Sequence, residues 1–153
     1  MQHTLVIIKP CAIQRALVGE IIKRFEQKGL RLAGIKMMQL TDSILDEHYA
    51  HLASRSFFQR IKDSMMATPV IVTCWEGKDA VSVVRSMTGA TNGREALAGT
   101  IRGDFSVSVQ ENIIHTSDSV ETAVVELKRF FNEDEIFNYN PVQMNYLYAN
   151  DEI

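Results

Sequence analysis

Cysteine is scarce in this 153-residue sequence, and its two cysteines are far apart. Cys11 and Cys74 form neither a C-x-x-C motif nor a disulfide framework, so we expect a reducing, cytoplasmic location. The four histidines are scattered, and His48 and His51 lack the H-E-x-x-H spacing of a zinc helix. The sequence therefore predicts no metal site built by the protein alone.

Long apolar runs and glycine-rich phosphate loops are missing too. The first apolar run, Leu5-Val6-Ile7-Ile8, is too short for a signal peptide or a membrane span, so neither export nor a membrane partner is expected. Neither G-x-x-x-x-G-K-[ST] nor G-x-G-x-x-G occurs in the sequence. If the protein handles nucleoside phosphates, side chains must hold them in place of a glycine cradle.

Positive charge is in slight deficit. Lys and Arg number 16 against 19 Asp and Glu, a net charge of −3, which argues against a nucleic-acid partner because such binding needs a basic surface. Residues 80–103 nevertheless contain Arg85, Arg94 and Arg102 with a single acidic residue among them. This segment indicates either a localised anionic ligand or a solvated helix face.

Length and patterning predict one domain over residues 1–153, with 46% hydrophobic residues. We expect strands at 4–8, 30–40, 69–75 and 105–109. Helices are expected at 17–28, from 41 past 48, at 57–66, at 80–87 and from 119 onward. Residues 88–100 read as a long loop, and such loops are usually functional. This alternation is compatible with an α+β sandwich of a small sheet and covering helices, with strand direction left open.

The segment from Asn112 to Ser119 reads N-I-I-H-T-S-D-S and carries the strongest functional signal. It places His115 before three capping residues of an amphipathic helix, where unpaired N–H groups and the helix dipole favour an anion such as phosphate. A lone histidine near a strand end is nevertheless more often an ordinary polar residue than a nucleophile. A hydrolase triad with Ser117 and Asp118 is disfavoured, because no G-x-S-x-G nucleophile motif is present.

Taken together, these segments resemble the nucleoside diphosphate kinase family over residues 4–131. The most specific matches are G-T-I-R-G-D-F at 99–105 and N-x-x-H-x-S-D-S at 112–119. Weaker matches are I-K-P at 8–10, H-Y at 48–49 and W-E-G at 75–77. The resemblance implies a ferredoxin-like sandwich, in which helices cover a four-stranded antiparallel sheet.

The resemblance also implies a ping-pong transfer of the γ-phosphate from a nucleoside triphosphate, typically ATP, to a nucleoside diphosphate. His115 would carry the phosphoryl group, Glu126 would set its tautomer, and Ser117 would support Glu126 or cap the helix. Lys9 and Tyr49 are implied as further catalytic residues. The residues implied to bind the nucleotide are Lys9, Phe57, Arg85, Thr91, Arg102, Val109 and Asn112. Phe57 and Val109 would sandwich the base without reading its edge, and Mg²⁺ would arrive with the phosphates.

Similar enzymes are homo-oligomers, hexamers or tetramers built from a common dimer, and four positions here depart from the family pattern. Cys11 replaces an Asp, Thr116 replaces a Gly beside His115, and Gly93 and Ala98 replace prolines of the long loop. We therefore expect a loop that loses more entropy on ordering and a higher assembly that resists heat less well than that of a proline-bearing relative. On this basis, Gly93→Pro should raise the melting temperature, provided that the backbone φ there is about −65° and the Gly93 N–H is free.

Two other functions remain as alternatives. The chain could be a weakly active member that acts as a nucleotide-binding or protein-binding module, such as a phosphohistidine-relay partner. It could also bind single-stranded nucleic acid through the basic segment and Phe57, although the acidic balance of the chain argues against this. Transfer of label from ATP through the protein to GDP separates the kinase from both.

Overall fold

A computed structural model describes residues 1–152, in which helices and strands alternate along the chain. The strands are β1 (Gln2–Ile8), β2 (Arg31–Met38), β3 (Val70–Gly77) and β4 (Ile114–Thr116). The α-helices are α1 (Pro10–Gln14), α2 (Val18–Gln27), α3 (Asp42–His48), α4 (Phe58–Met66), α5 (Ala80–Thr88), α6 (Ile101–Phe105) and α7 (Val120–Phe130). Short 3₁₀ helices occupy Ala50–Leu52, Glu133–Glu135 and Val142–Tyr146.

The four strands form one antiparallel sheet in the order β2-β3-β1-β4, which confirms the predicted ferredoxin-like α+β sandwich. The central strand β1 pairs along its length with β3, while the short β4 pairs with its second half. His115 lies opposite Ile7 in that register, with Val6 opposite Thr116. The sheet therefore holds the histidine against its most buried strand.

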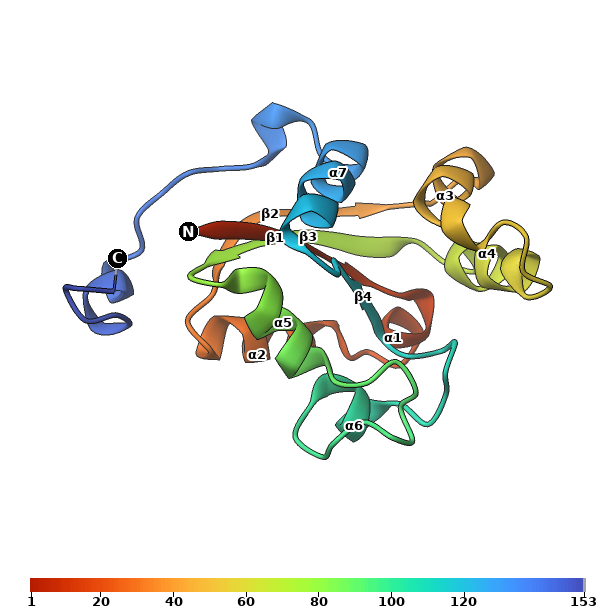
Figure 1. The fold of residues 1–153 in the computed structure, drawn as a ribbon, viewed down its shortest axis with the longest axis horizontal. Helices are drawn as coiled ribbons and strands as arrows, with labels where there is room; N and C mark the ends of the chain where they lie inside the picture. The colour runs from red at the N-terminus through yellow and green to blue at the C-terminus, as the bar shows by residue number, and fades with distance from the viewer. Residues whose placement is uncertain (153) are drawn as a thin grey trace.

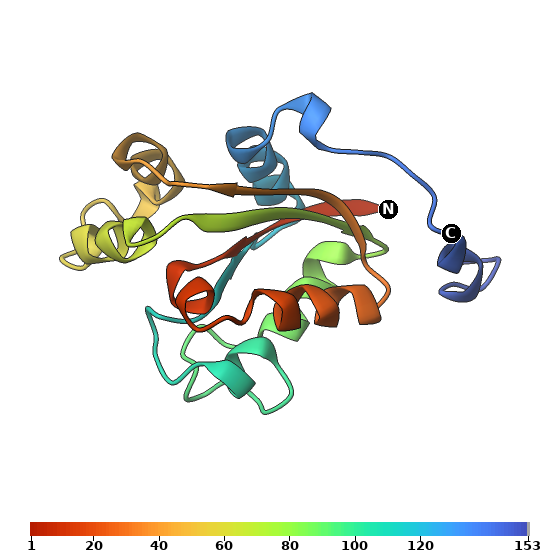
Figure 2. The same ribbon diagram turned by 180° about the vertical axis from the view of Figure 1, so that it is seen from behind.

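Helices cover both faces of the sheet, as Figures 1 and 2 show. On one face α7 packs beside the α3 and α4 hairpin, and on the other lie α2 and α5. Alternate residues of β1 point into the two cores, with Leu5 and Ile7 in one and Val6 and Ile8 in the other. Burial on both faces explains why this strand is a continuous apolar run rather than an alternating one.

Local signals set most helix ends close to their predicted positions. The hydroxyl of Thr41 accepts a hydrogen bond from the Ile44 N–H at the start of α3, and Ser119 does the same for Thr122 at the start of α7. Gly29 follows α2 with a φ of 95°, a conformation that glycine adopts without strain. These caps were readable from the sequence because each involves residues within one turn.

The strand predicted at residues 105–109 is wrong. Phe105 ends α6, and the sheet's last strand is β4, which carries His115 itself. The Ser106 hydroxyl lies 3.1 Å from the backbone carbonyl oxygens of both Ser108 and Glu111, which share its single hydrogen, so the segment folds back on itself instead of extending. The alternating F-S-V-S-V pattern thus reflects a serine-bridged turn.

Two long connections lie near the end of the sheet that carries His115. Residues 89–100 form the predicted loop between α5 and α6, and residues 106–113 lead into β4. No helix within residues 1–152 is long and apolar enough to cross a membrane.

Candidate active site

A single cleft of about 960 Å³ gathers nearly all of the residues that the sequence singled out. It lies between the α3 and α4 hairpin, the two long loops, β4 and α7. The predicted residues that line it are Lys9, Tyr49, Phe57, Arg85, Thr91, Arg102, Val109, Asn112, His115 and Glu126. Ser117 is the exception, because it is fully buried behind Glu126.

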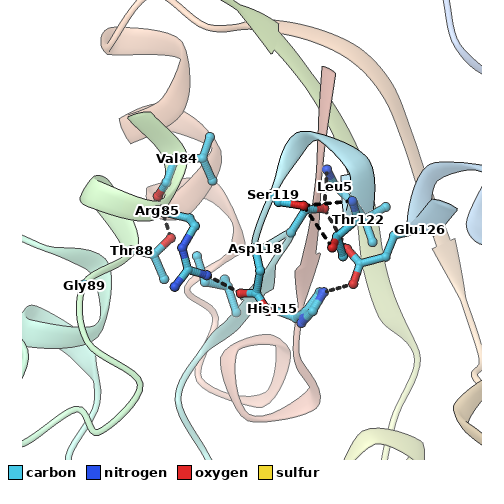
Figure 3. Close-up of polar contacts among 12 residues, drawn as sticks. Leu5, Val84, Arg85, Thr88, Gly89, His115, Asp118, Ser119, Thr122 and Glu126 are labelled. Carbon is cyan, nitrogen blue, oxygen red and sulfur yellow. Dashed lines mark hydrogen bonds and ion pairs between the residues drawn. The ribbon is translucent and has the colours of Figure 1, made fainter. Parts of the chain in front are cut away.

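His115 is held by one ring nitrogen, as Figure 3 shows. Its Nε2 lies 2.9 Å from Oε1 of Glu126, and the other oxygen of this carboxylate accepts a 2.6 Å hydrogen bond from Ser117. An ionised carboxylate can only accept, so Nε2 carries the hydrogen and Nδ1 keeps a free lone pair. The ring nitrogen of His115 that is free to react is therefore Nδ1.

Glu126 is buried on the inner face of α7, yet it remains ionised. Burial alone raises the pKa of this carboxyl, but the hydrogen bond and charge of His115, together with the Ser117 hydroxyl, outweigh it and hold the pKa below its usual value. The Ser117 hydroxyl also accepts a 3.3 Å hydrogen bond from the Leu5 N–H of β1. Glu126 is thus tied to the central strand as well as to the histidine.

The backbone before β4 is strained. Ile113 has a φ of 78°, and the Ile114 N–H donates to the Asn112 carbonyl at 2.9 Å, which makes a γ-turn around a β-branched residue. The Ile113 carbonyl accepts from the Lys9 N–H, and the side chain is fully buried. Such strain persists only where the surroundings enforce it, and here it aims the next residues into the cleft.

Lys9 and Asn112 form the floor of the cleft. Lys9 Nζ donates to Asn112 Oδ1 at 2.6 Å and to the Gln110 carbonyl at 3.2 Å. The amide nitrogen of Asn112 donates to the carbonyls of Thr91 and Val109. Both amide hydrogens are thereby used within the protein, and the amide oxygen of Asn112 orients Lys9.

Burial, followed by the nearby positive charge of Arg102, lowers the pKa of Lys9 to about 8. Glu111 opposes this shift and also contacts the Cys11 thiol, whose pKa is raised by burial. Glu111 therefore supplies a carboxylate near Lys9 where Cys11 replaces the usual Asp. The departure at Cys11 leaves Lys9 with an acidic neighbour.

The two arginines of the cleft are in different environments. Arg102 is buried and donates to the carbonyls of Gly89, Asn112 and Ile114, which joins three segments of the site. Burial lowers the pKa of Arg102 to about 10, so it stays charged at neutral pH. Arg85 is 47% exposed and pairs with Asp118 at the rim of the cleft (Figure 3).

Tyr49, Phe57 and Val109 provide the aromatic and apolar walls. Burial first and the charge of Glu126 second raise the pKa of Tyr49, so its hydroxyl stays protonated and can donate a hydrogen bond. Phe57 precedes α4 and is 36% exposed, and Val109, on the loop before β4, is 51% exposed. The Arg60 guanidinium, one turn after Phe57, donates to the Gln110 side chain and joins these two walls.

Sequence reasoning assigned no role to His48 or Arg129, both of which line the cleft. His48 packs edge-on against His115, with ring centroids 4.5 Å apart. No spacing rule joins these residues, because they lie on α3, β4 and α7. The Thr116 departure is accommodated, since Thr116 occupies a buried strand position where a β-branched residue fits.

One cluster in the cleft has ligand types that a metal could use. Ligand atoms of His48, His115 and Glu126 lie within 4.8 Å of one another. This set is poor in oxygen, and Oε1 of Glu126 already accepts from His115, so it does not suit Mg²⁺. Oxygen ligands are available instead at the cleft wall from Asp118 and Glu121.

Comparison with known proteins identifies the family to which nearly the whole chain is similar. Residues 2–136 match the family model described as nucleoside diphosphate kinase. A nucleoside diphosphate kinase of Parabacteroides distasonis is 66% identical over 152 residues, covering 99% of both chains. Human nucleoside diphosphate kinase A is 47% identical over 147 residues, covering 96% of this chain and 97% of the relative.

Solved structures of nucleoside diphosphate kinases have the same fold as this chain. The nucleoside diphosphate kinase of Halobacterium salinarum in complex with CDP superposes with a TM-score of 0.95 at 35% identity, over 97% of this chain and 99% of that one. The enzyme of Encephalitozoon cuniculi, solved without ligand, has a TM-score of 0.93 at 43% identity, over 97% and 100% of the two chains.

Proposed function

This chain belongs to the nucleoside diphosphate kinase family, and on that premise we propose that His115 is the histidine that carries the transferred phosphoryl group. The protein moves the γ-phosphate of a nucleoside triphosphate to a nucleoside diphosphate in two steps through a phosphohistidine. The observation that carries the assignment is the free Nδ1 of His115 in a nucleotide-sized cleft, with Nε2 anchored to Glu126.

In the first half-reaction the Nδ1 lone pair attacks the γ-phosphorus, and the bond from phosphorus to the β-bridging oxygen breaks as the nucleoside diphosphate leaves. No proton has to move, because Nε2 keeps its hydrogen. The ring becomes cationic in character, and the Glu126 carboxylate at 2.9 Å stabilises that charge. In the second half-reaction a terminal oxygen of another nucleoside diphosphate attacks the phosphohistidine and the N–P bond breaks.

Positive charge and donors around His115 would bind the phosphates. Lys9 has three N–H groups and donates two within the protein, so one is left for the nucleotide. Arg85, Arg102, Thr91 and the Tyr49 hydroxyl face the same space. These groups stabilise the charge that spreads over the equatorial oxygens during transfer.

We assign Phe57 and Val109 to the base, which would lie between them. Neither side chain has a polar group, so both contact any base by stacking and dispersion. Their exposed position at the open end of the cleft supports a broad choice of nucleotides.

We propose Mg²⁺ as the divalent cation, bound with the nucleotide rather than in a protein cage. It would neutralise charge on the phosphates during transfer. Asp118 and Glu121 at the wall of the cleft are oxygen donors of the kind that Mg²⁺ prefers.

We also propose a homo-oligomer, a hexamer or tetramer built from dimers, that acts in the cytoplasm. Support for the dimer comes from β2, an eight-residue edge strand on which Ile35 and Met37 are about half exposed. A long apolar edge favours pairing with another strand. Support for the location comes from Cys11 and Cys74, which are both free thiols.

The central test is to incubate the protein with γ-labelled ATP, remove the nucleotide and add unlabelled GDP. We expect labelled protein first and labelled GTP afterwards, and the protein adduct should be acid-labile and alkali-stable. His115→Ala should give neither product. His3→Ala, an exposed histidine of β1 outside the cleft, is the matched control and should label like the wild type. An acid-stable adduct, or one that survives in His115→Ala, would rule out His115.

A further inference from the structure

Behind His115 lies a second imidazole that is held by a cation. Nδ1 of His48 accepts a 3.1 Å hydrogen bond from Arg129 Nη1, and Arg129 Nε donates at 2.9 Å to Glu47. The His48 side chain is only 1% exposed, and its ring packs edge-on against His115. The reaction outlined above uses neither His48 nor Arg129.

We propose that Arg129 is a positioning residue that keeps Glu126 available to His115 by fixing the tautomer of His48. The proposal rests on the assignment of His115 as the phosphorylated residue. It concerns the group behind the nucleophile and adds no contact to the nucleotide.

The first step of the argument is the direction of the hydrogen bond. A guanidinium only donates, so Nδ1 of His48 must be the acceptor. Its hydrogen therefore sits on Nε2. Glu47 orients the guanidinium from the other side and so holds this arrangement in place.

The second step is competition for one oxygen. Oε1 of Glu126 lies 2.9 Å from Nε2 of His115 and 3.8 Å from Nδ1 of His48. With the hydrogen on Nε2, His48 cannot donate to this oxygen. With the hydrogen on Nδ1, it would compete with His115 for the carboxylate that orients the nucleophile and stabilises its charge.

The third step is that His48 does not favour its present tautomer by itself. Its Nε2 is buried and has no hydrogen-bond partner in residues 1–152, so the hydrogen there is unsatisfied. Moving that hydrogen to Nδ1 would place it on the nitrogen that lies 3.8 Å from the Glu126 carboxylate, close enough for a small rotation of the ring to form a hydrogen bond. Arg129 is the group that opposes this move.

Protonation of His48 does not complicate this choice of tautomer. Burial, the facing His115 ring, Arg129 and His51 lower the pKa of His48 to about 3, while Glu126 opposes the shift. The remaining faces of the ring pack against Tyr49 and Phe130. His48 is thus neutral under assay conditions, and only the position of its hydrogen can change.

The experiment compares Arg129→Met, which removes the donor, with Arg129→Lys, which retains one. In Arg129→Met we expect the rate of phosphorylation by ATP to fall roughly tenfold with KM little changed, the lower end of the loss seen when a group that orients a metal-ligating histidine is removed. Arg129→Lys should keep most of the rate. Lys128→Met is the matched control, because it removes the neighbouring charge on α7 from an exposed side chain.

A spectroscopic measurement reads the tautomer itself. With ¹⁵N-labelled histidine, Nδ1 of His48 should be pyridine-like and Nε2 pyrrole-like in the wild type and in Lys128→Met. The two assignments should exchange in Arg129→Met. A rate loss without this exchange, or an exchange without a rate loss, would overturn the proposal.

A double-mutant cycle separates action through His48 from a general structural effect. In a His48→Phe background there is no competing donor, so Arg129→Met should no longer change the phosphorylation rate. A tenfold loss that persists there would also overturn the proposal. Wild-type labelling on His115 is measured in the same series, so failure of the phosphohistidine assignment would be seen separately.

Discussion

At the residue scale, Lys9 differs from an ordinary lysine because its pKa lies near 8. Burial and the Arg102 charge disfavour its protonated form in the folded protein. We propose that its positive charge binds phosphate, and on that proposal the protonation of this one side chain links pH to both activity and stability.

We predict that kcat/KM for ADP with the phosphorylated enzyme falls as the pH rises through about 8, because Lys9 then loses its charge. The guanidinium introduced by Lys9→Arg does not deprotonate in this range, so the profile of that variant should stay flat to a higher pH. A falling limb of the same midpoint in Lys9→Arg would assign the titration to another group.

The same shift predicts how stability depends on pH. The folded pKa is about 8 and the usual value is 10.5, so between these limits the unfolded chain binds more protons than the folded one. The Lys9 contribution is therefore unfavourable below pH 8 and is relieved as the pH rises toward 10.5. Urea denaturation from pH 7 to 10 should show wild type gaining stability relative to Lys9→Met.

Arg102 and Arg85 both face the cleft, yet we predict different effects on folding. Arg102→Met leaves three carbonyls without their donor, so we expect a loss of about 3 kcal/mol of unfolding free energy, since each buried unsatisfied group costs roughly 1–3 kcal/mol. Arg85→Met breaks an exposed pair and should change stability by less than about 1 kcal/mol. Both variants should lose kcat/KM by roughly 100-fold. Equal midpoints of urea unfolding in Arg102→Met and Arg85→Met would contradict the predicted difference in stability.

At the scale of the element, the long loop between α5 and α6 is packed more closely against its neighbours than its glycine content suggests. Gly93 is buried, and its N–H donates to the Ser108 carbonyl at 3.1 Å. A Cβ at this position would overlap the Ser106 carbonyl oxygen and side chain. The condition on which Gly93→Pro was expected to stabilise the protein, a free Gly93 N–H, is therefore not met.

We now predict that Gly93→Pro lowers the melting temperature by roughly 5 °C or more, because it removes a hydrogen bond and forces Ser106 to move. Ala98→Pro is the matched control, since Ala98 is exposed and its N–H donates no hydrogen bond in the described part of the chain. Its melting temperature should stay close to that of the wild type. Thermal unfolding followed by circular dichroism measures both melting temperatures. A higher melting temperature in Gly93→Pro would contradict the close packing of Gly93 against Ser106 and its hydrogen bond to Ser108.

At the scale of the whole molecule, the sheet ends in two different edges. β4 is three residues long, whereas β2 is eight residues long and leaves Ile35 and Met37 about half exposed. The C-terminal tail covers the first half of β2, where the Ala33 carbonyl accepts a 2.8 Å hydrogen bond from the Phe137 N–H. The second half, with Ile35 and Met37, is an edge of the kind that pairs readily with another chain. This edge is the basis on which we propose a dimer.

We predict that Met37→Lys shifts the protein toward monomer in sedimentation at micromolar concentration, because a charge on the edge strand disfavours strand pairing. Val142→Lys is the control, since Val142 is 83% exposed on the C-terminal tail and should leave the assembly unchanged. A wild type that sediments only as monomer would refute the dimer, and an unaffected Met37→Lys would move its interface elsewhere.

Sequence by itself determined the features that depend on neighbours within a turn or two. The caps at Thr41 and Ser119 and the stop at Gly29 were readable because their hydrogen bonds and conformation are local. The continuous apolar run of β1 indicated a strand buried on both faces. The motif around His115 indicated the family, and family membership indicated the fold and the reaction.

Tertiary structure alone decided which groups are free to act. It left Nδ1 of His115 free while Nε2 bonds Glu126, used both Asn112 amide hydrogens within the protein, and brought Arg129 to His48. Only the tertiary structure shows that the alternating segment 105–109 forms a turn and that Ser106 occupies the space beside Gly93. These outcomes depend on hydrogen bonds and packing between distant or competing groups, and whether a buried donor finds its acceptor is fixed only when the chain has folded.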